Sequence, residues 1–152
     1  MASTLKEQIQ QAENTCFSTF MNYFGNHITD VKHPKDITSP IDLKVQSFNG
    51  NWSYWELKCM SQPHSKYKEV GYIIDTSKYE TLLEVANTSD KKVFYCMFWA
   101  DGKATVWDIK RAHAKYAPYI SRFSTTMGNN TNQKFGAYLL SYNSCTLFSE
   151  PK

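Results

Sequence analysis

The sequence predicts an α/β (α+β) fold in which a central mixed β-sheet is flanked by helices. Near the amino terminus, apolar side chains recur every three or four residues, which is typical of an amphipathic helix. Residues 41–59 and 93–109 instead alternate apolar with polar or mixed positions, which is typical of β-hairpins. The chain of 152 residues is 41% hydrophobic and 15% aromatic, and it has no internal repeat or long linker. We therefore expect one domain spanning residues 1–152.

The first expected element is a helix over residues 4–24. Thr4 and Glu7 match a capping box, apolar side chains follow at helical spacing, and Gly25 supplies a stop. On a helical wheel Glu13 falls inside the apolar arc, where a carboxylate is costly unless it is paired or bound to a cation. Glu13 is therefore either the partner of a lysine at the core edge or an acid of a functional site. The second interpretation requires the helix to pack on the polar face of the first hairpin.

The later elements follow from the same two periodicities. After the first hairpin comes a short strand, and then a helix with a capping box formed by Ser77 and Glu80. The second hairpin turns at Asp101-Gly102 and is followed by a short helix, a loop rich in Gly and Asn, and a last strand. The expected strand covers residues 70–74, the helix starts at 77, and the strands of the second hairpin cover 93–99 and 104–109. The short helix is expected at 110–119, the loop at 127–132 and the last strand at 135–142.

Composition excludes several classes of protein. The hydrophobic content argues against intrinsic disorder, a collagen-like repeat and a small disulfide scaffold. The net charge of +3 is compatible with a polyanionic partner. No apolar run approaches the roughly 20 residues that cross a bilayer, so no membrane partner is expected. The amino terminus has no apolar signal region, and we therefore expect an intracellular (cytoplasmic) location.

The cysteines and histidines show no metal-binding pattern. The four cysteines are far apart in the sequence and form no CxxC pair, which predicts buried free thiols rather than metal ligands. The four histidines form no HExxH or HxxxH motif, so a zinc site is not expected. The cysteines are Cys16, Cys59, Cys96 and Cys145.

The hydrophobic pattern also predicts a register for the first hairpin. A three-residue loop over 49–51 places Leu43 opposite Leu57 and puts the apolar residues of both strands on one face, whereas a two-residue loop turns one set outward. The other face then pairs Asp42 with Lys58 and Lys44 with Glu56.

Two acids and a lysine at one strand end have chemistry available to them. Paired carboxylates hold Mg²⁺ through oxygen ligands, and the ion neutralises a phosphate and acidifies a bound water. A neighbouring lysine orients that water or stabilises the developing charge. The hairpin alone is equally compatible with cross-strand ion pairs on the surface, each worth about 0.2 to 1 kcal/mol.

In their order along the chain, these residues resemble the PD-(D/E)xK nucleases of the restriction-endonuclease-like superfamily. The match in element order covers roughly residues 4–109 and is similar in outline to Holliday-junction resolvases and to small phage or restriction-type nucleases. The motif matches Pro40-Ile41-Asp42 and then Glu56-Leu57-Lys58, although Ile41 separates Pro40 from Asp42. The (D/E)xK tripeptide occurs seven times here, and only the one at Glu56 lies late in a strand whose hairpin partner begins with an acid.

The resemblance implies a restriction-endonuclease-like core and an enzyme, a metal-dependent endonuclease that hydrolyses DNA phosphodiester bonds with Mg²⁺ or Mn²⁺. Asp42 and Glu56 would bind the ion, with the Leu57 carbonyl as a further ligand. Lys58 would position or deprotonate the attacking water, and Glu13 would contact the metal or its waters. The expected partner is DNA, and a homodimer would suit a cut in both strands.

Several polar residues near the expected site suit contact with a nucleic acid backbone. Lysines interleaved with aromatic residues after the second strand are typical of phosphate contact and base stacking, and equally of a solvated loop. A helix amino terminus near residue 77 favours an anion. The candidate contacts are Lys44, Gln62, Lys66, Lys68 and Lys78.

Three alternatives stay open. Within the same hypothesis, the motif shifts upstream, with Asp36 as first acid and Asp42-Leu43-Lys44 as the signature. In a different class, the chain is a non-catalytic nucleic-acid-binding or protein-interaction module on the same fold, and the acids form an ion-pair cluster. A phosphate-ester or nucleotide hydrolase would require a closed pocket rather than an open groove.

Overall fold

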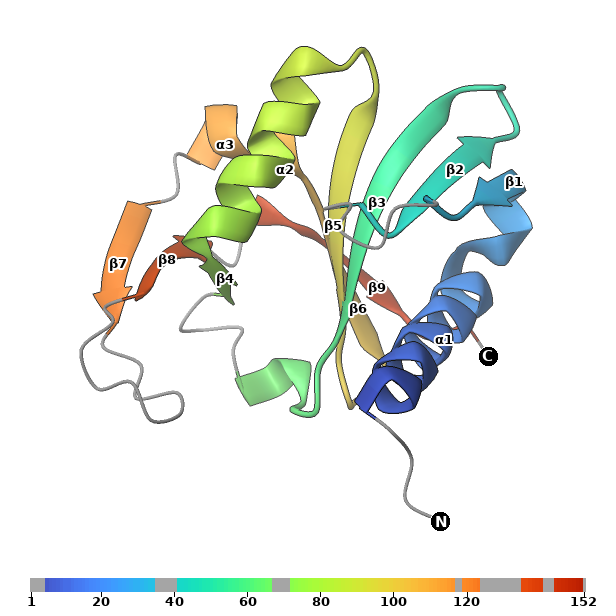
Figure 1. The fold of residues 1–152 in the computed structure, drawn as a ribbon, viewed down its shortest axis with the longest axis horizontal. Coiled ribbons are helices and arrows are strands. Elements are labelled where there is room, and N and C mark those ends of the chain that lie inside the picture. The colour runs from blue at the N-terminus through green and yellow to red at the C-terminus, as the bar shows by residue number, and fades with distance from the viewer. Residues whose placement is uncertain are drawn as a thin grey trace.

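Helices lie on both sides of a central six-stranded sheet of mixed direction, which confirms the predicted fold class (Figure 1). The computed structural model describes residues 5–34, 41–66, 72–116, 119–123, 135–140 and 144–151. The strand order is β1-β2-β3-β5-β6-β9, and a second sheet has the order β4-β8-β7. The helices are α1 (Leu5–Phe24), α2 (Thr76–Thr88) and α3 (Ile109–Tyr116), with short 3₁₀ helices at Gly25–His27 and His64–Lys66. The strands are β1 (Ile28–Lys32), β2 (Leu43–Ser47), β3 (Trp52–Cys59), β4 (Tyr72–Asp75), β5 (Lys92–Phe98), β6 (Lys103–Asp108), β7 (Tyr119–Phe123), β8 (Phe135–Leu140) and β9 (Thr146–Ser149).

Strands β3 and β5 run parallel in the middle of the six-stranded sheet. The other described neighbours in that sheet, β1 with β2, β2 with β3, β5 with β6 and β6 with β9, are antiparallel. A parallel pair needs a long crossover between its strands, and here β4 and α2 supply it. The crossover returns α2 over the sheet, beside the strand that carries Glu56.

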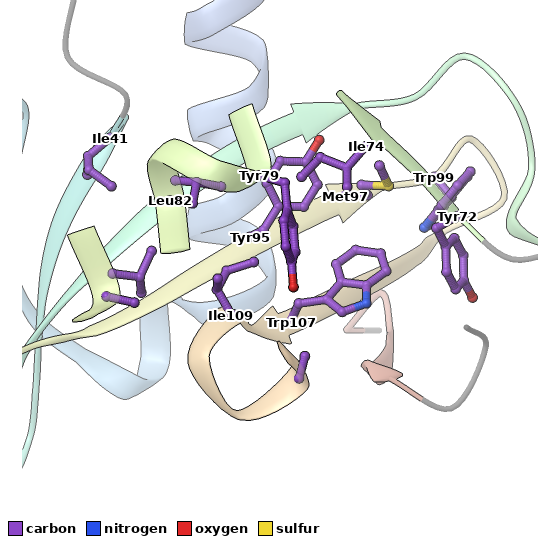
Figure 2. Close-up of a cluster of buried hydrophobic side chains, with 13 residues drawn as sticks. Ile41, Tyr72, Ile74, Tyr79, Leu82, Tyr95, Met97, Trp99, Trp107 and Ile109 are labelled. Atoms are coloured by element: carbon purple, nitrogen blue, oxygen red, sulfur yellow. The ribbon is translucent and has the colours of Figure 1, made fainter. Parts of the chain in front are cut away.

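Each face of the central sheet has its own hydrophobic core. On one face α1 packs through Phe20, which is fully buried with Leu43 and Cys96. On the other face Tyr79 and Leu82 of α2 are buried with side chains of β5 and β6 (Figure 2). Because side chains alternate along a strand, Glu56 faces α2 whereas Trp55 and Leu57 belong to the α1 core.

The predicted register of the first hairpin is wrong by two residues. Leu43 lies opposite Trp55 and Gln46 opposite Trp52, and the Ser47 N–H donates to the Asn51 carbonyl (3.0 Å), so the loop is residues 48–50, as long as predicted but one position earlier. Within this loop the Asn49 side chain accepts a hydrogen bond from the Asn51 N–H (3.0 Å), and Gly50 has a φ of 86°. A shift of two residues leaves every side chain on its face, so the hydrophobic pattern could not distinguish the two registers.

This shift changes the expected cross-strand partners of the acids. Lys44 lies opposite Tyr54 and not opposite Glu56. One step beyond the Leu43 pair, the register aligns Asp42 with Glu56, and the predicted pairing of Asp42 with Lys58 is therefore wrong. The two acids face each other across the strands.

Several element boundaries differ from the prediction. Helix α2 begins at Thr76 with Asp75 in the N-cap position, so Ser77 lies inside the helix and does not form the expected capping box. Strands β1, β7 and β9 were not predicted, because each is short and, in addition, β9 pairs with β6, which lies far away along the chain. The strand predicted at 70–74 is observed at 72–75, and α3 begins one residue early, at Ile109.

The cysteines are free, as predicted, although not all are buried. Cys16 and Cys96 are buried, Cys145 is partly exposed and Cys59 is exposed, so the expectation of four buried thiols is wrong. Cys59 is the last residue of β3, and it is exposed to solvent there.

Some predictions fall outside the described residues. These are the capping box at Thr4, the upstream signature that begins at Asp36, and the loop at 127–132. In the part of the chain that the structure describes, every helix is too short or too polar to cross a bilayer.

Candidate active site

Asp42 is held at the entry of β2 by two hydrogen bonds to β3. Its backbone N–H donates to the Trp55 carbonyl (2.9 Å), and its carboxylate Oδ2 accepts from the Leu57 N–H (2.8 Å). The Asp42 carboxylate thus accepts a hydrogen bond that a backbone carbonyl would accept if the antiparallel ladder continued past Asp42. This contact fixes the carboxylate against the middle of β3, level with Glu56.

Glu56 is buried, with 6% of its surface exposed. Burial raises the pKa of its carboxyl to about 8, and a hydrogen bond and negative charge from Asp42 contribute to this rise, against the opposing effect of Lys78. Asp42 and Glu56 are therefore close enough to share a proton. A carboxyl pair in which one member is buried is stabilised when it holds either a proton or a cation.

Lys78 supplies a positive charge at this pair. Its Nζ lies 3.1 Å from Glu56 Oε2, and its side chain is 43% exposed. Sequence reasoning placed Lys78 near the site as a phosphate contact but missed its ion pair with Glu56. Residue spacing carries no signal for it, because the contact depends on where α2 returns over β3.

Lys58 lies two residues after Glu56, is exposed, and by strand alternation faces the same side of the sheet as Glu56. Between them, Leu57 donates its N–H toward Asp42. The N–H and C=O of one strand residue point to the same edge, so the Leu57 carbonyl is directed to the edge where Asp42 lies. Asp42, Glu56 and the Leu57 backbone therefore lie together, through a register that differs from the predicted one, and Lys58 follows on the same strand.

The position of α1 differs from the one that a role for Glu13 requires. The helix packs on the face of Leu43 and Cys96, opposite to the face of Glu56. The expectation that α1 covers the polar face of the hairpin is wrong. The backbone of Glu13 lies in α1, and its side chain lies outside the described residues.

The candidate nucleic-acid contacts are partly described. Lys44 is exposed, and its Nζ lies 5.7 Å from the centre of the Tyr54 ring. Lys66 is exposed in the segment after β3, with its Nζ 3.5 Å from Gln62 Oε1. Lys68 lies outside the described residues. Of the described lysines in this set, Lys78 is the one with a contact to an acid of the site.

Tyr95 of β5 is a neighbour of the acids that the sequence did not indicate. It pairs with Glu56 in the parallel register and is almost fully buried. Burial raises the pKa of its hydroxyl above the usual value, and the negative charge of Glu56 adds to this effect. Tyr95 therefore helps to exclude water from the side of Glu56 that faces β5.

The donor set suits a small hard cation. Two carboxylates and a backbone carbonyl provide oxygen ligands, and Mg²⁺ is commonly bound by one or two carboxylates together with water and substrate phosphates. Among the described side chains, His, Cys, Asp and Glu form no group of three or more that could hold a metal, so water or phosphate would complete the shell. The residues present therefore fit Mg²⁺ or Mn²⁺.

A cavity of about 530 Å³ lies elsewhere, on the α1 face of the sheet near the tip of the first hairpin. Phe20, Trp55 and Phe94 are among the residues that line it. It is separated from Glu56 by the sheet. Neither Asp42 nor Glu56 lines this cavity.

Among known proteins, the chain shows similarity to solved structures. No protein-family model and no curated protein sequence matches the chain. A similar arrangement occurs in the 1.6 Å structure of Hjc, a Holliday junction resolvase from the archaeal hyperthermophile Archaeoglobus fulgidus. The likeness has a TM-score of 0.48 and 9% sequence identity, and it covers 82% of this chain and 81% of that chain.

Proposed function

We propose that the chain is a divalent-metal-dependent nuclease that hydrolyses DNA phosphodiester bonds at Asp42, Glu56 and Lys58. The observation that carries this proposal is the carboxyl pair, in which Asp42 is fixed by the Leu57 N–H and Glu56 is buried beside it. Two like charges placed together out of water are unfavourable unless a cation or proton joins them. A pair held in this way is suited to bind an ion.

Each residue has a role that follows from its position. Asp42 and Glu56 would hold Mg²⁺ or Mn²⁺, with the Leu57 carbonyl on the same edge. When bound, the ion neutralises charge on the phosphate and acidifies water. Lys58, exposed on the same side as Glu56, orients the attacking water or takes up its proton, and its charge stabilises the negative charge that develops on the phosphate.

The positive charges of the chain suit a DNA substrate. Lys44 and Lys66 are exposed, Lys78 reaches the acids from α2, and the chain carries a net charge of +3. Lysines around a carboxylate pair would hold phosphates at the site while the acids hold the ion. We extend the proposal to Lys44, Gln62, Lys66, Lys68 and Lys78 as backbone contacts, and to a second copy of the chain for a cut in both strands.

One observation favours the alternative of a non-catalytic module on the same fold. The Glu56–Lys78 ion pair at 3.1 Å could neutralise the buried carboxylate without any metal. Under that alternative, Lys58 has no chemical role, because it is exposed and is not part of the Glu56–Lys78 ion pair. Replacement of Lys58 therefore separates the two functions.

The test is a cleavage assay with Lys58→Ala. Duplex, single-stranded and four-way-junction DNA would be incubated with the parent protein and Mg²⁺ or Mn²⁺, with a chelator as the blank. We expect Lys58→Ala to fold normally and to lose about 10²- to 10⁴-fold in cleavage rate, the usual contribution of a proton-transfer group. Lys92→Ala, which removes an exposed lysine at the other end of the parallel partner strand, is the matched control and should cleave like the parent.

Two results would count against the nuclease. If Lys58→Ala cleaves as fast as the parent, the assignment of the motif is wrong. If the parent cleaves none of the three substrates with either metal, but still binds DNA, the non-catalytic module is the better account.

A further inference from the structure

We propose that Cys16 and Cys59 form a reversible intramolecular disulfide, so that this dithiol is a redox modification site that joins α1 to β3. Their Sγ atoms lie 2.9 Å apart, although the residues are 43 positions apart in the sequence. A disulfide bond is about 2.0 Å long, so closing this pair requires a movement of about 1 Å. The proposal is independent of the proposed nuclease function.

The packing of α1 explains why the two thiols meet. Cys16 lies one turn before Phe20, and both are buried against the central sheet. On β3, Cys59 follows Leu57 on the α1 face, since side chains alternate along a strand. The fully buried Phe20 anchors the helix, so the approach of the two sulfur atoms follows from the core and not from a mobile segment.

The two thiols differ in access to solvent in the way that a two-step oxidation requires. Cys59 is exposed, and a small disulfide can reach it. Cys16 is 8% exposed and is reached only by the sulfur already beside it. Among the other cysteines, Cys96 is fully buried and Cys145 is partly exposed with no described cysteine as a hydrogen-bond partner.

The oxidant is a low-molecular-weight disulfide, such as oxidised glutathione. The Cys59 sulfur, as thiolate, attacks one sulfur of the oxidant, which forms a mixed disulfide and releases one glutathione thiolate. The Cys16 sulfur then gives up its proton and attacks Cys59 Sγ, which forms the intramolecular bond and releases the second glutathione. Two protein thiols are oxidised, one disulfide is reduced to two thiols, and excess thiol reverses both steps.

The cross-link acts on the strand that carries the candidate active site. Cys59 directly follows Lys58, and Glu56 lies three residues earlier on the same strand. A bond at this point ties α1 to the end of β3 and closes a long loop of the unfolded chain. The oxidised protein should therefore unfold at a temperature higher by roughly 5 °C or more.

The experiment treats the folded full chain with oxidised glutathione, quenches with acid and measures the intact mass and the peptide map. We expect the loss of two hydrogen atoms, a linked pair of peptides that contain Cys16 and Cys59, and a raised Tm that dithiothreitol reverses. Cys59→Ser, a change at an exposed position, should abolish both effects, whereas the matched variant Cys145→Ser should keep them.

Other outcomes would overturn the proposal. A glutathione adduct that persists on Cys59 of the parent would show that Cys16 cannot reach it. A disulfide between two copies of the chain, or no reaction at Cys59 at a concentration that oxidises a free peptide thiol, would equally exclude an intramolecular site.

Discussion

Glu56 lies buried beside a second carboxyl, so its protonation state depends on what else binds there. Burial and Asp42 favour the protonated form, and Lys78 favours the ionised form. A divalent ion would act in the same sense as Lys78 and more strongly, because it carries twice the charge. The same carboxyl therefore links metal binding to stability.

The first prediction concerns the pH dependence of stability without metal. The pKa of Glu56 is raised from its ordinary value of 4.5, which applies to the unfolded chain, to about 8 in the folded protein, so the folded state binds the proton more tightly. Stability from this group is present below the unfolded pKa and is lost as pH rises toward 8. Relative to Glu56→Gln, the parent should lose stability between about pH 5 and pH 8 in a chelating buffer.

Urea denaturation of both proteins across this pH range checks the prediction. Addition of Mg²⁺ should reduce the loss in the parent and leave Glu56→Gln unchanged. If the free energies of unfolding of the parent and of Glu56→Gln change with pH in the same way, the raised pKa assigned to Glu56 is wrong.

At the residue scale, much of the candidate site could be predicted from the sequence. Strand alternation places Asp42, Glu56 and Lys58 on one side in the predicted and in the observed register, because the two differ by an even number of residues. The ion pair to Lys78 could not be predicted, since it depends on the packing of α2. Neither could the Cys16–Cys59 contact, which depends on which face α1 covers.

At the scale of elements, the tip of the first hairpin sets the register that brings the acids together. Gly50 adopts a φ of 86°, in the left-handed region that other residues occupy at a cost. A Cβ at this position would meet no atom within 4 Å, so that cost is conformational and not steric. Turn geometry, rather than the apolar pattern, therefore decides the alignment of Asp42 with Glu56.

The second prediction follows from this geometry. Gly50→Ala should destabilise the protein by about 1 kcal/mol, whereas Gly50→Asn should cost less because Asn tolerates the left-handed region. Chemical denaturation of the parent and both variants measures the difference. Equal stability of Gly50→Ala and the parent would mean that the tip does not need this conformation.

The third prediction tests the face on which α1 packs. Phe20 is fully buried between α1 and the sheet, and the next residue, Met21, is 37% exposed. Phe20→Ala should therefore cost about 3 to 5 kcal/mol, and Met21→Ala, the matched control, much less. Thermal unfolding of both variants measures this contrast, and similar effects of the two would contradict the observed orientation of the helix.

At the scale of the whole molecule, the sequence patterns do not predict which distant segments pair as neighbouring strands. The parallel pairing of β3 with β5 could be inferred from the helix between them, because a crossover is needed. The short strands β1 and β9 at the two edges of the central sheet, and the second sheet β4-β8-β7, could not. Strands β9 and β4 pair with segments far away along the chain, and β1, although next to its partner β2, has no alternation of its own.

The central claim is that Asp42 and Glu56 together bind a divalent ion on DNA. The most direct measurement is calorimetric titration of Mg²⁺ into a complex with duplex or junction DNA, with Lys58→Ala used because it keeps both acids and should cleave much more slowly. We predict saturable binding to the Lys58→Ala complex, and its loss in the complex of Asp42→Asn/Glu56→Gln. If both complexes bind Mg²⁺ equally, or neither binds it, the two carboxyls are not a metal site and the account is wrong.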